Sequence, residues 1–194
     1  MPKTNNRKTQ YFGEYLPYHN EQLKLIDGSE QYGIYKEILI KTIEQLDASI
    51  KIHKRILVVR MDLHLNIYTG DNKRISNFMN NTNKYLSRNY DINKMGFVWA
   101  REMERAKTQH YHTALFLDGN KIQHPKKLLP ALKEKWLPFG HIPTISNPFY
   151  YIDKDNHTQQ RADAIERLSY LAKIRGKGYR DTQAKDYGTS RLKS

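Results

Sequence analysis

The tripeptide His110-Tyr111-His112 is the strongest candidate for chemistry in this sequence. It opens an apolar run, and because alternate residues of a β-strand point to one face, a strand here would place the two imidazoles side by side. Neutral imidazoles are common metal ligands. A chain with 8 histidines in 194 residues contains roughly 0.3 such pairs by chance, so the tripeptide alone is a weak signal. Its apolar context strengthens the signal, because an unpartnered polar group there would be costly.

A carboxylate on a neighbouring strand would complete this site with an oxygen ligand. Residues 96–102 and 110–118 alternate as the two strands of an antiparallel hairpin, which brings Glu102 opposite the histidines. Glu104 has the same strand parity but lies nearer the turn, where a solvated charge is the ordinary outcome. Glu102 is therefore the preferred ligand, and two imidazoles with one carboxylate suit Mg²⁺ or Mn²⁺.

Asp62 and His64 share one face at the end of segment 55–65, whose branched apolar residues predict a central strand covered on both faces. If this strand neighbours the hairpin, the two side chains could add a ligand or orient the histidines from behind. A polar strand end with no role in a site explains them equally well.

Tyr170 is the candidate nucleophile, in a helix expected over about 160 to 174. Lys173 lies three residues further on and shares its helix face, away from the apolar side of the helix. A phenol ordinarily has a pKa of about 10, so nucleophilic attack needs a nearby cation to favour the phenolate. The alternative is a surface tyrosine beside a Glu166–Lys173 ion pair, and the helix taken alone favours this alternative.

The elements that must position these residues alternate between helical and strand periods. Apolar residues recur at helical spacing over about 30–50 and about 75–87, and a helix disturbed at Pro130 is expected over 125–137. Residues 142–153 contain two prolines and can supply only an irregular or edge strand. The chain length suits one domain, which we place at 21–194 behind a flexible basic arm at 1–20.

The charge balance favours a polyanionic partner. The chain carries 33 Lys and Arg against 20 Asp and Glu, a net charge of +13, which points to nucleic acid ahead of a membrane surface. Six basic residues are expected to contact a DNA backbone: Arg101, Arg105, Lys107, Arg175, Lys177 and Arg180. The absence of cysteine excludes disulfides, thiolate zinc sites and cysteine nucleophiles. No apolar run is long enough for a membrane span and no targeting segment is evident, so we expect a soluble protein of the cytoplasm.

The order of these residues resembles the HUH superfamily of rolling-circle replication initiators and relaxases. The resemblance covers about residues 55–192 and rests on Asp62-Leu63-His64, Glu102, His110-Tyr111-His112 and Tyr170-Leu171-Ala172-Lys173. More narrowly, the chain resembles the replication-initiator-like proteins of filamentous phages and of phage-derived elements in bacterial genomes, with which we associate the closing Tyr187-Gly188-Thr189-Ser190-Arg191. The resemblance places the protein in a bacterial host cell.

The resemblance implies that His110, His112 and a third polar ligand, for which we choose Glu102, bind Mg²⁺ or Mn²⁺. It implies that Tyr170 attacks a phosphate of single-stranded or hairpin DNA, stays joined to its 5′ side and frees a 3′-hydroxyl, with no small-molecule cofactor. Lys173 matches the lysine of the Tyr-x-x-Lys form. Positions 173 and 174 are Lys and Ile, so an alternating two-tyrosine cycle does not fit. We expect single-tyrosine nicking and joining.

The expected fold is α+β, with a central antiparallel sheet of the RRM-like (HUH/Rep) type, helices on one face and an added N-terminal helix near 30–50. The main alternative function is a sequence-specific DNA-binding regulator on the same fold that does not nick. A non-haem iron enzyme would also use two histidines and one carboxylate, but it needs neither the positive charge nor Tyr170. An RRM-like RNA binder needs exposed aromatic residues on its strands, for which only Phe97 and Trp99 are candidates.

Overall fold

A mostly antiparallel sheet forms the centre of an α+β fold in this computed structural model, which describes residues 9–26, 29–103 and 108–193. Among these residues the sheet has six strands, in the order β10-β6-β7-β5-β8, with β9 also paired to β5. Their bounds are Arg55–Leu65 (β5), Gly96–Glu102 (β6), His110–Asp118 (β7), Gly140–His141 (β8), Phe149–Asp153 (β9) and Tyr187–Thr189 (β10). The predicted core strand and hairpin are confirmed, and so is an edge strand within 142–153, since β9 pairs with the outer side of β5. The two-residue strand β8, just before that range, was not predicted.

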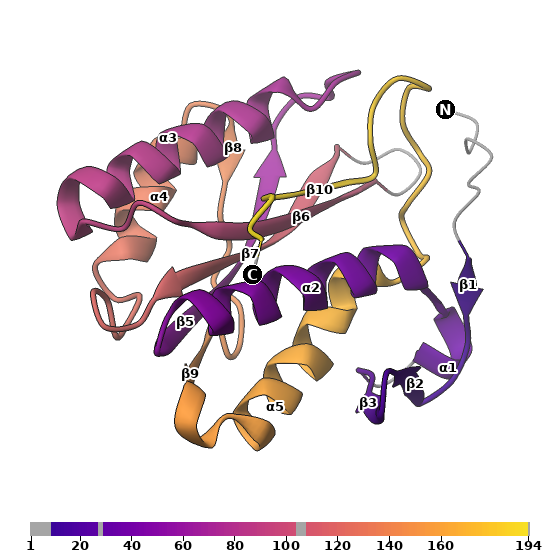
Figure 1. Cartoon of the computed structure of the whole chain (residues 1–194). Helices are drawn as coiled ribbons and strands as arrows, with labels where there is room; N and C mark the ends of the chain where they lie inside the picture. Colours follow the sequence, from indigo (N-terminus) through magenta and orange to yellow (C-terminus); the bar gives the residue numbers. More distant parts are fainter. Residues whose placement is uncertain (1–8, 27–28, 104–107, 194) are drawn as a thin grey trace.

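Helices cover both faces of the sheet, whereas helices on one face were expected (Figure 1). The helices α2 (Lys36–Ile52) and α5 (Thr158–Leu168) pack on one face, and α3 (Lys73–Tyr90) and α4 (Leu128–Trp136) pack on the other. The cause lies in β5, where Ile56 and Val58 enter the core beneath α2 while Leu57 and Val59 enter the core beneath α3. A strand that is apolar on both sides needs a helical layer on each.

The N-terminal region is folded from residue 10, which differs from the arm expected over 1–20; residues 1–8 lie outside the described part. A hairpin of β2 (Tyr15–Tyr18) and β3 (Glu21–Lys24) turns at His19, which has a left-handed φ of 50°. Leu16 pairs with Leu23 across this hairpin, and both are buried in the core beneath α2. This pair of leucines around a two-residue turn is the hairpin signal in the sequence. The remaining elements here are β1 (Gln10–Tyr11), α1 (Ser29–Tyr32) and β4 (Ile34–Tyr35).

The end of the chain departs from the single helix expected over 160–174. Helix α5 follows the 3₁₀ turn η1 (Lys154–Asn156), stops at Leu168, and continues as a second 3₁₀ turn, η2 (Ser169–Ala172). The segment after η2 then turns back across the sheet edge through Gly176 and Gly178, whose φ angles of 78° and 85° are left-handed. Across the described residues, the structure has no helix long and apolar enough to span a bilayer.

Candidate metal centre and nucleophile

The strand register brings the predicted metal ligands together. In the β6–β7 pair Glu102 lies directly opposite His110, and in the β5–β7 pair Asp62 lies opposite His112. Glu102 lies on the same face of β6 as Val98 and Ala100, which are buried beneath α2. The other side chains of the group lie on this face at the ends of their strands. The apolar alternation that builds this core therefore also points the polar residues to one face.

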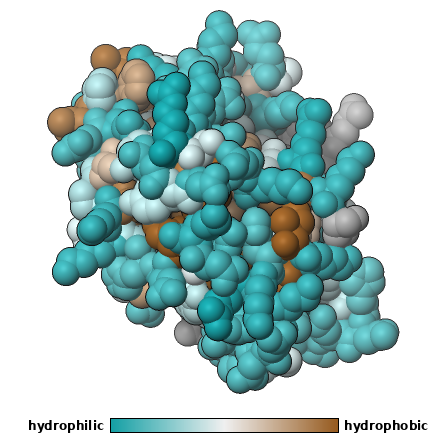
Figure 2. All heavy atoms as spheres, turned by 60° about the vertical axis from the view of Figure 1, so that its left-hand side comes forward, coloured by the Kyte–Doolittle hydropathy of each residue, from teal (hydrophilic) through white to brown (hydrophobic). Residues whose placement is uncertain are grey.

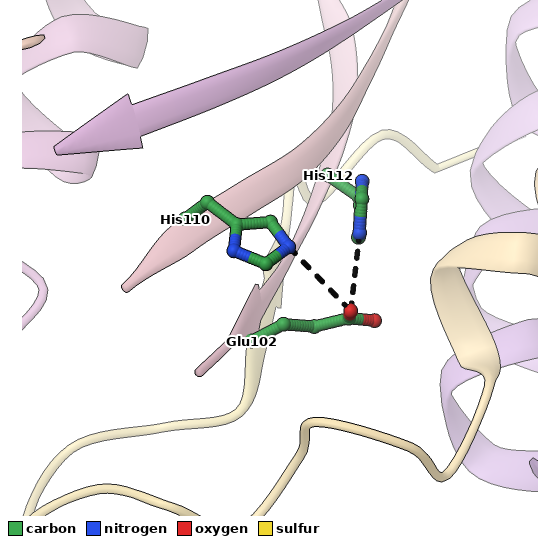
Figure 3. A group of neighbouring side chains, drawn as sticks. All are labelled: Glu102, His110 and His112. Atoms are coloured by element: carbon green, nitrogen blue, oxygen red, sulfur yellow. Dashed lines mark hydrogen bonds and ion pairs between the residues drawn. The ribbon is translucent and has the colours of Figure 1, made fainter. Parts of the chain in front are cut away.

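The Glu102 carboxylate points between the two histidines (Figure 3). Its Oε2 atom lies 3.1 Å from His112 Nε2 and 3.6 Å from His110 Nε2. One ligand atom from each of the three residues lies within 4.8 Å of the other two, which is close enough for all three to hold one metal ion. The side chains of Glu102 and His112 are 3% and 5% exposed and that of His110 is 22% exposed, so the group is reached from the His110 side.

Asp62 holds the other nitrogen of His112. Its Oδ1 lies 2.7 Å from His112 Nδ1, and Arg60 contacts the same oxygen at 3.3 Å. Burial alone would raise the pKa of Asp62, but the hydrogen bond from His112 and the charges of His112 and Arg60 outweigh it and lower the pKa. An imidazole that donates Nδ1–H to Asp62 presents its Nε2 lone pair to Glu102, so two acceptors face each other at 3.1 Å. Such a contact is favourable only with a cation, a proton or a metal ion, between them.

His64 has a different role from Asp62. Its ring stacks between His110 and His141, with ring centroids 4.9 Å away on each side, so it supports His110 rather than joining the carboxylate. Burial and the neighbouring positive charges of His110 and His141 lower the pKa of His64 to about 4. His64 is therefore neutral at pH 7.

Lys177 is the site residue that sequence reasoning misassigned. It was expected to contact DNA, but it is fully buried and its Nζ lies 2.6 Å from Glu102 Oε1. The backbone of Gly176 pairs with Met103 at 2.8 Å, which carries Lys177 under the sheet edge. Burial alone would raise the pKa of Glu102, but the charges of Lys177 and His112 hold it well below its usual range. Burial lowers the pKa of Lys177, with Glu102 opposing that effect.

Tyr170 lies beside this centre, on η2 rather than on a regular helix. Its ring meets the His112 ring edge-on, with the centroids 4.9 Å apart. The Lys173 ammonium lies 2.5 Å from the Tyr170 hydroxyl and 3.4 Å from Glu102 Oε2, so a single cation touches both the phenol and the ligand set. The alternative Glu166–Lys173 pair does not form, because Glu166 pairs with Lys24 at 3.2 Å.

Two arginines that the sequence did not indicate also reach Tyr170. The guanidinium carbons of Arg60 and Arg167 lie 5.0 Å and 5.9 Å from the centre of its ring. Burial lowers the pKa of Arg60, with Asp62 opposing that effect. The Nε atoms of both arginines are buried and have no hydrogen-bond partner among the described residues. The sequence does contain a feature that could have indicated Arg60. It stands two residues before Asp62 in an apolar strand, so the two side chains lie on one face.

The sequence model of the YagK/YfjJ C-terminal domain matches residues 19–190. The chain belongs to this family. The YagK/YfjJ C-terminal domain is associated with phage- and prophage-derived bacterial proteins. Comparison with curated proteins and with solved structures gave no significant match.

The matched region of this YagK/YfjJ domain includes all the residues of the centre. The structure also corrects the expectation that Arg101 contacts DNA. Arg101 does not contact solvent: it is 2% exposed and donates to the backbone oxygens of Thr69 and Asp71 at 2.6 Å and 2.8 Å. It alternates with Glu102 and so faces the α3 side of the sheet. Trp99 is buried and Phe97 is packed against that same core, so these two candidates form no aromatic platform for RNA bases.

The other basic residues proposed as DNA contacts fall into three groups. Arg180 is held by Asp186, with Nε 2.6 Å from Oδ1 and a side chain only 14% exposed. Arg175 is exposed. Arg105 and Lys107, like the alternative ligand Glu104, lie outside the described residues.

Proposed function

We propose that this YagK/YfjJ domain nicks and joins single-stranded DNA through Tyr170, in a metal-dependent reaction of the kind that starts rolling-circle replication. The observation that carries the proposal is the position of Lys173, whose ammonium contacts both the Tyr170 hydroxyl and Glu102. The candidate nucleophile therefore contacts a cation, and the same cation contacts one of the candidate metal ligands. Phosphoryl transfer by an oxygen nucleophile needs this combination.

The ligand set fits a divalent cation. His110 Nε2, His112 Nε2 and Glu102 Oε2 converge, and the two facing acceptors of His112 and Glu102 call for a positive charge between them. Lys177 is paired with Oε1, and Oε2 is the oxygen that faces the two histidines. Two imidazoles and one carboxylate suit Mg²⁺ or Mn²⁺, and when bound such an ion would polarise the scissile phosphate.

The protein's own residues would carry the rest of the reaction. Lys173 stabilises the Tyr170 phenolate, and the guanidinium groups of Arg60 and Arg167 add positive charge beside the Tyr170 ring, which favours a phosphate there. Attack forms a bond from the Tyr170 oxygen to phosphorus and breaks the bond from phosphorus to the 3′ oxygen. The phenol loses one proton and the released 3′ oxygen gains one, so the proton count is unchanged. The reverse attack by a 3′-hydroxyl rejoins the strand.

The order of the core elements supports an RRM-like type of sheet. Along the chain the elements run β5-α3-β6-β7-α4-β9, and across the sheet the strands run β6-β7-β5-β9. A β-α-β-β-α-β unit with this arrangement is the ferredoxin-like motif. The phage- and prophage-derived family supports a role in replication of a mobile element.

The test is trapping of the covalent intermediate. Incubation with Mn²⁺ and a pool of single-stranded DNA fragments should yield a protein–DNA adduct that survives denaturant, and mass spectrometry should place it on Tyr170. Tyr170→Phe keeps the ring and should abolish the adduct, whereas Lys173→Ala should slow its formation. Tyr179→Phe and Tyr187→Phe are matched controls, since each removes one tyrosine hydroxyl from the basic end of the chain and keeps the ring.

Two outcomes would contradict the proposal. An adduct on Tyr179 or Tyr187 would move the nucleophile. Tight DNA binding that does not depend on metal and gives no adduct with any strand would favour the non-nicking regulator instead.

A further inference from the structure

Helix α3 differs from the other long helices in its charge. Its sequence, KRISNFMNNTNKYLSRNY, contains four basic residues, five asparagines and no acidic residue. On the opposite face of the sheet, α2 carries three basic and three acidic residues, and α5 carries two of each. A helix whose charges serve only solubility mixes both signs, as α2 and α5 do. All the charged residues of α3 are therefore positive, and the helix lies on the face of the sheet opposite the candidate metal centre.

The exposed side of α3 presents a continuous polar stripe. Asn77, Asn81, Lys84 and Arg88 follow one another at spacings of four, three and four residues, so at 100° per residue they lie on one narrow face. All four are exposed, and none of their side chains has a hydrogen bond or ion pair to another described residue. The stripe runs about 17 Å along the helix, at 1.5 Å per residue, which is roughly the length of five base pairs.

A hollow of about 460 Å³ runs alongside this stripe. Its walls include the four stripe residues and, from the other side, Lys135 and Phe139. Lys135 lies over the Tyr85 ring of α3 at 4.7 Å, which fixes a further cation on the rim. Residues 126–136, which are α4 and the two residues before it, carry four lysines and one glutamate, all exposed, and so add positive charge beside α3.

The face of the molecule that carries α3 and α4 is hydrophilic over most of its area (Figure 2). Its hydrophobic patches are small and separate, which argues against an apolar protein partner. Lysine and arginine neutralise phosphates, and asparagine and arginine on a helix are the side chains that read adenine and guanine edges in the major groove. The major groove of A-form RNA is too narrow and deep for such a helix.

We infer that α3 and the hollow beside it form a binding surface for double-stranded DNA, separate from the proposed nicking site. The helix lies along the major groove with Asn77 and Asn81 towards the bases. Lys84, Arg88 and Lys135 contact phosphates on the side of the hollow. The inference does not rest on the nicking reaction, because its residues lie on the other face of the sheet from Tyr170.

The experiment measures binding of a fluorescein-labelled 20-base-pair DNA duplex by anisotropy across a series of salt concentrations. The variant Lys84→Ala/Arg88→Ala should bind roughly tenfold more weakly. The negative slope of log K against log salt should become shallower by about 1.8, because two phosphate contacts are lost. The matched control, Lys41→Ala/Lys54→Ala, removes two exposed lysines outside α3 and α4 and should change neither quantity.

Additional measurements distinguish this inference from the proposed nicking function and from binding of other partners. Adduct formation on single-stranded DNA should be unchanged in Lys84→Ala/Arg88→Ala, whereas Tyr170→Phe should bind the duplex normally. Equal affinity and equal salt slope for wild type and the α3 variant would overturn the inference, as would a wild type that does not bind the duplex. Equally tight binding of a 20-base-pair RNA duplex would show that α3 does not read a B-form groove.

Discussion

Loss of the buried ammonium at Lys177 should strongly destabilise the fold. Lys177→Met removes the charge but keeps most of the chain volume, and it leaves Glu102, which is 3% exposed, without its 2.6 Å partner. Removing one member of a buried ion pair costs about 3–5 kcal/mol, because the remaining charge stays buried. Glu102 keeps Lys173 at 3.4 Å from its other oxygen, so we expect a value near the lower end, about 3 kcal/mol.

Urea denaturation in the presence of a chelator measures this loss. Lys41→Met is the control, because its pair with Glu44 is solvent-exposed and should be worth about 0.5 kcal/mol or less. In a double-mutant cycle, Lys177→Met/Glu102→Gln should lose less free energy of unfolding than the two single variants together, since no unpaired charge remains. A loss below about 1 kcal/mol for Lys177→Met, or strict additivity, would refute the assignment of Lys177 to the carboxylate.

Two other predictions concern the histidines. Saturating Mn²⁺, at about 100 times its Kd, should raise the Tm of the wild type by roughly 5–10 °C, because ligand binding to the folded state alone adds about 2.7 kcal/mol. His110→Ala should lose this shift while His124→Ala keeps it, and an equal response of all three proteins in thermal denaturation would contradict the ligand set. The folded-state pKa of His64, about 4, lies below its ordinary value of 6.5, so the unfolded chain binds this proton more readily and stability should fall as pH drops from about 6.5 towards 4. His64→Phe should make the urea midpoint depend less on pH over that range, and an unchanged pH dependence would argue against a half-buried, neutral His64.

The parts of the site that the sequence could predict are those fixed by local periodicity. Alternation along 96–102 and 110–118 determines which residues face together, and a short connection determines the register, so Glu102 could be placed opposite His110. The spacing from Tyr170 to Lys173 likewise brings the two side chains together, although on a 3₁₀ turn rather than the expected helix.

The parts that could not be predicted depend on contacts between distant segments. Lys177 stands in a basic, glycine-containing tail and has the features of a surface lysine. Only the return of the chain through two left-handed glycines takes it beneath Glu102, 75 residues earlier. The two helical layers were missed for a related reason, because an apolar strand shows that both faces are covered but not which helices cover them.

The hairpin β6–β7 connects the two proposed surfaces, because consecutive residues of a strand face opposite sides of the sheet. Glu102 and His112 point to the candidate metal centre, and their neighbours Arg101 and Tyr111 point to the α3 side. Arg101 donates to the Asn72 side chain at 3.2 Å, and the Tyr111 hydroxyl donates to the same oxygen at 3.2 Å.

Asn72 is the residue from which α3 begins. The strands that hold the candidate metal ligands therefore also contact the first turn of the helix that we propose binds duplex DNA. Since both sets of side chains come from β6 and β7, a duplex on α3 and a single strand at Tyr170 would lie on opposite faces of the same two strands. That arrangement is what a protein needs if it is to bind a duplex and cut a strand at a fixed distance from it.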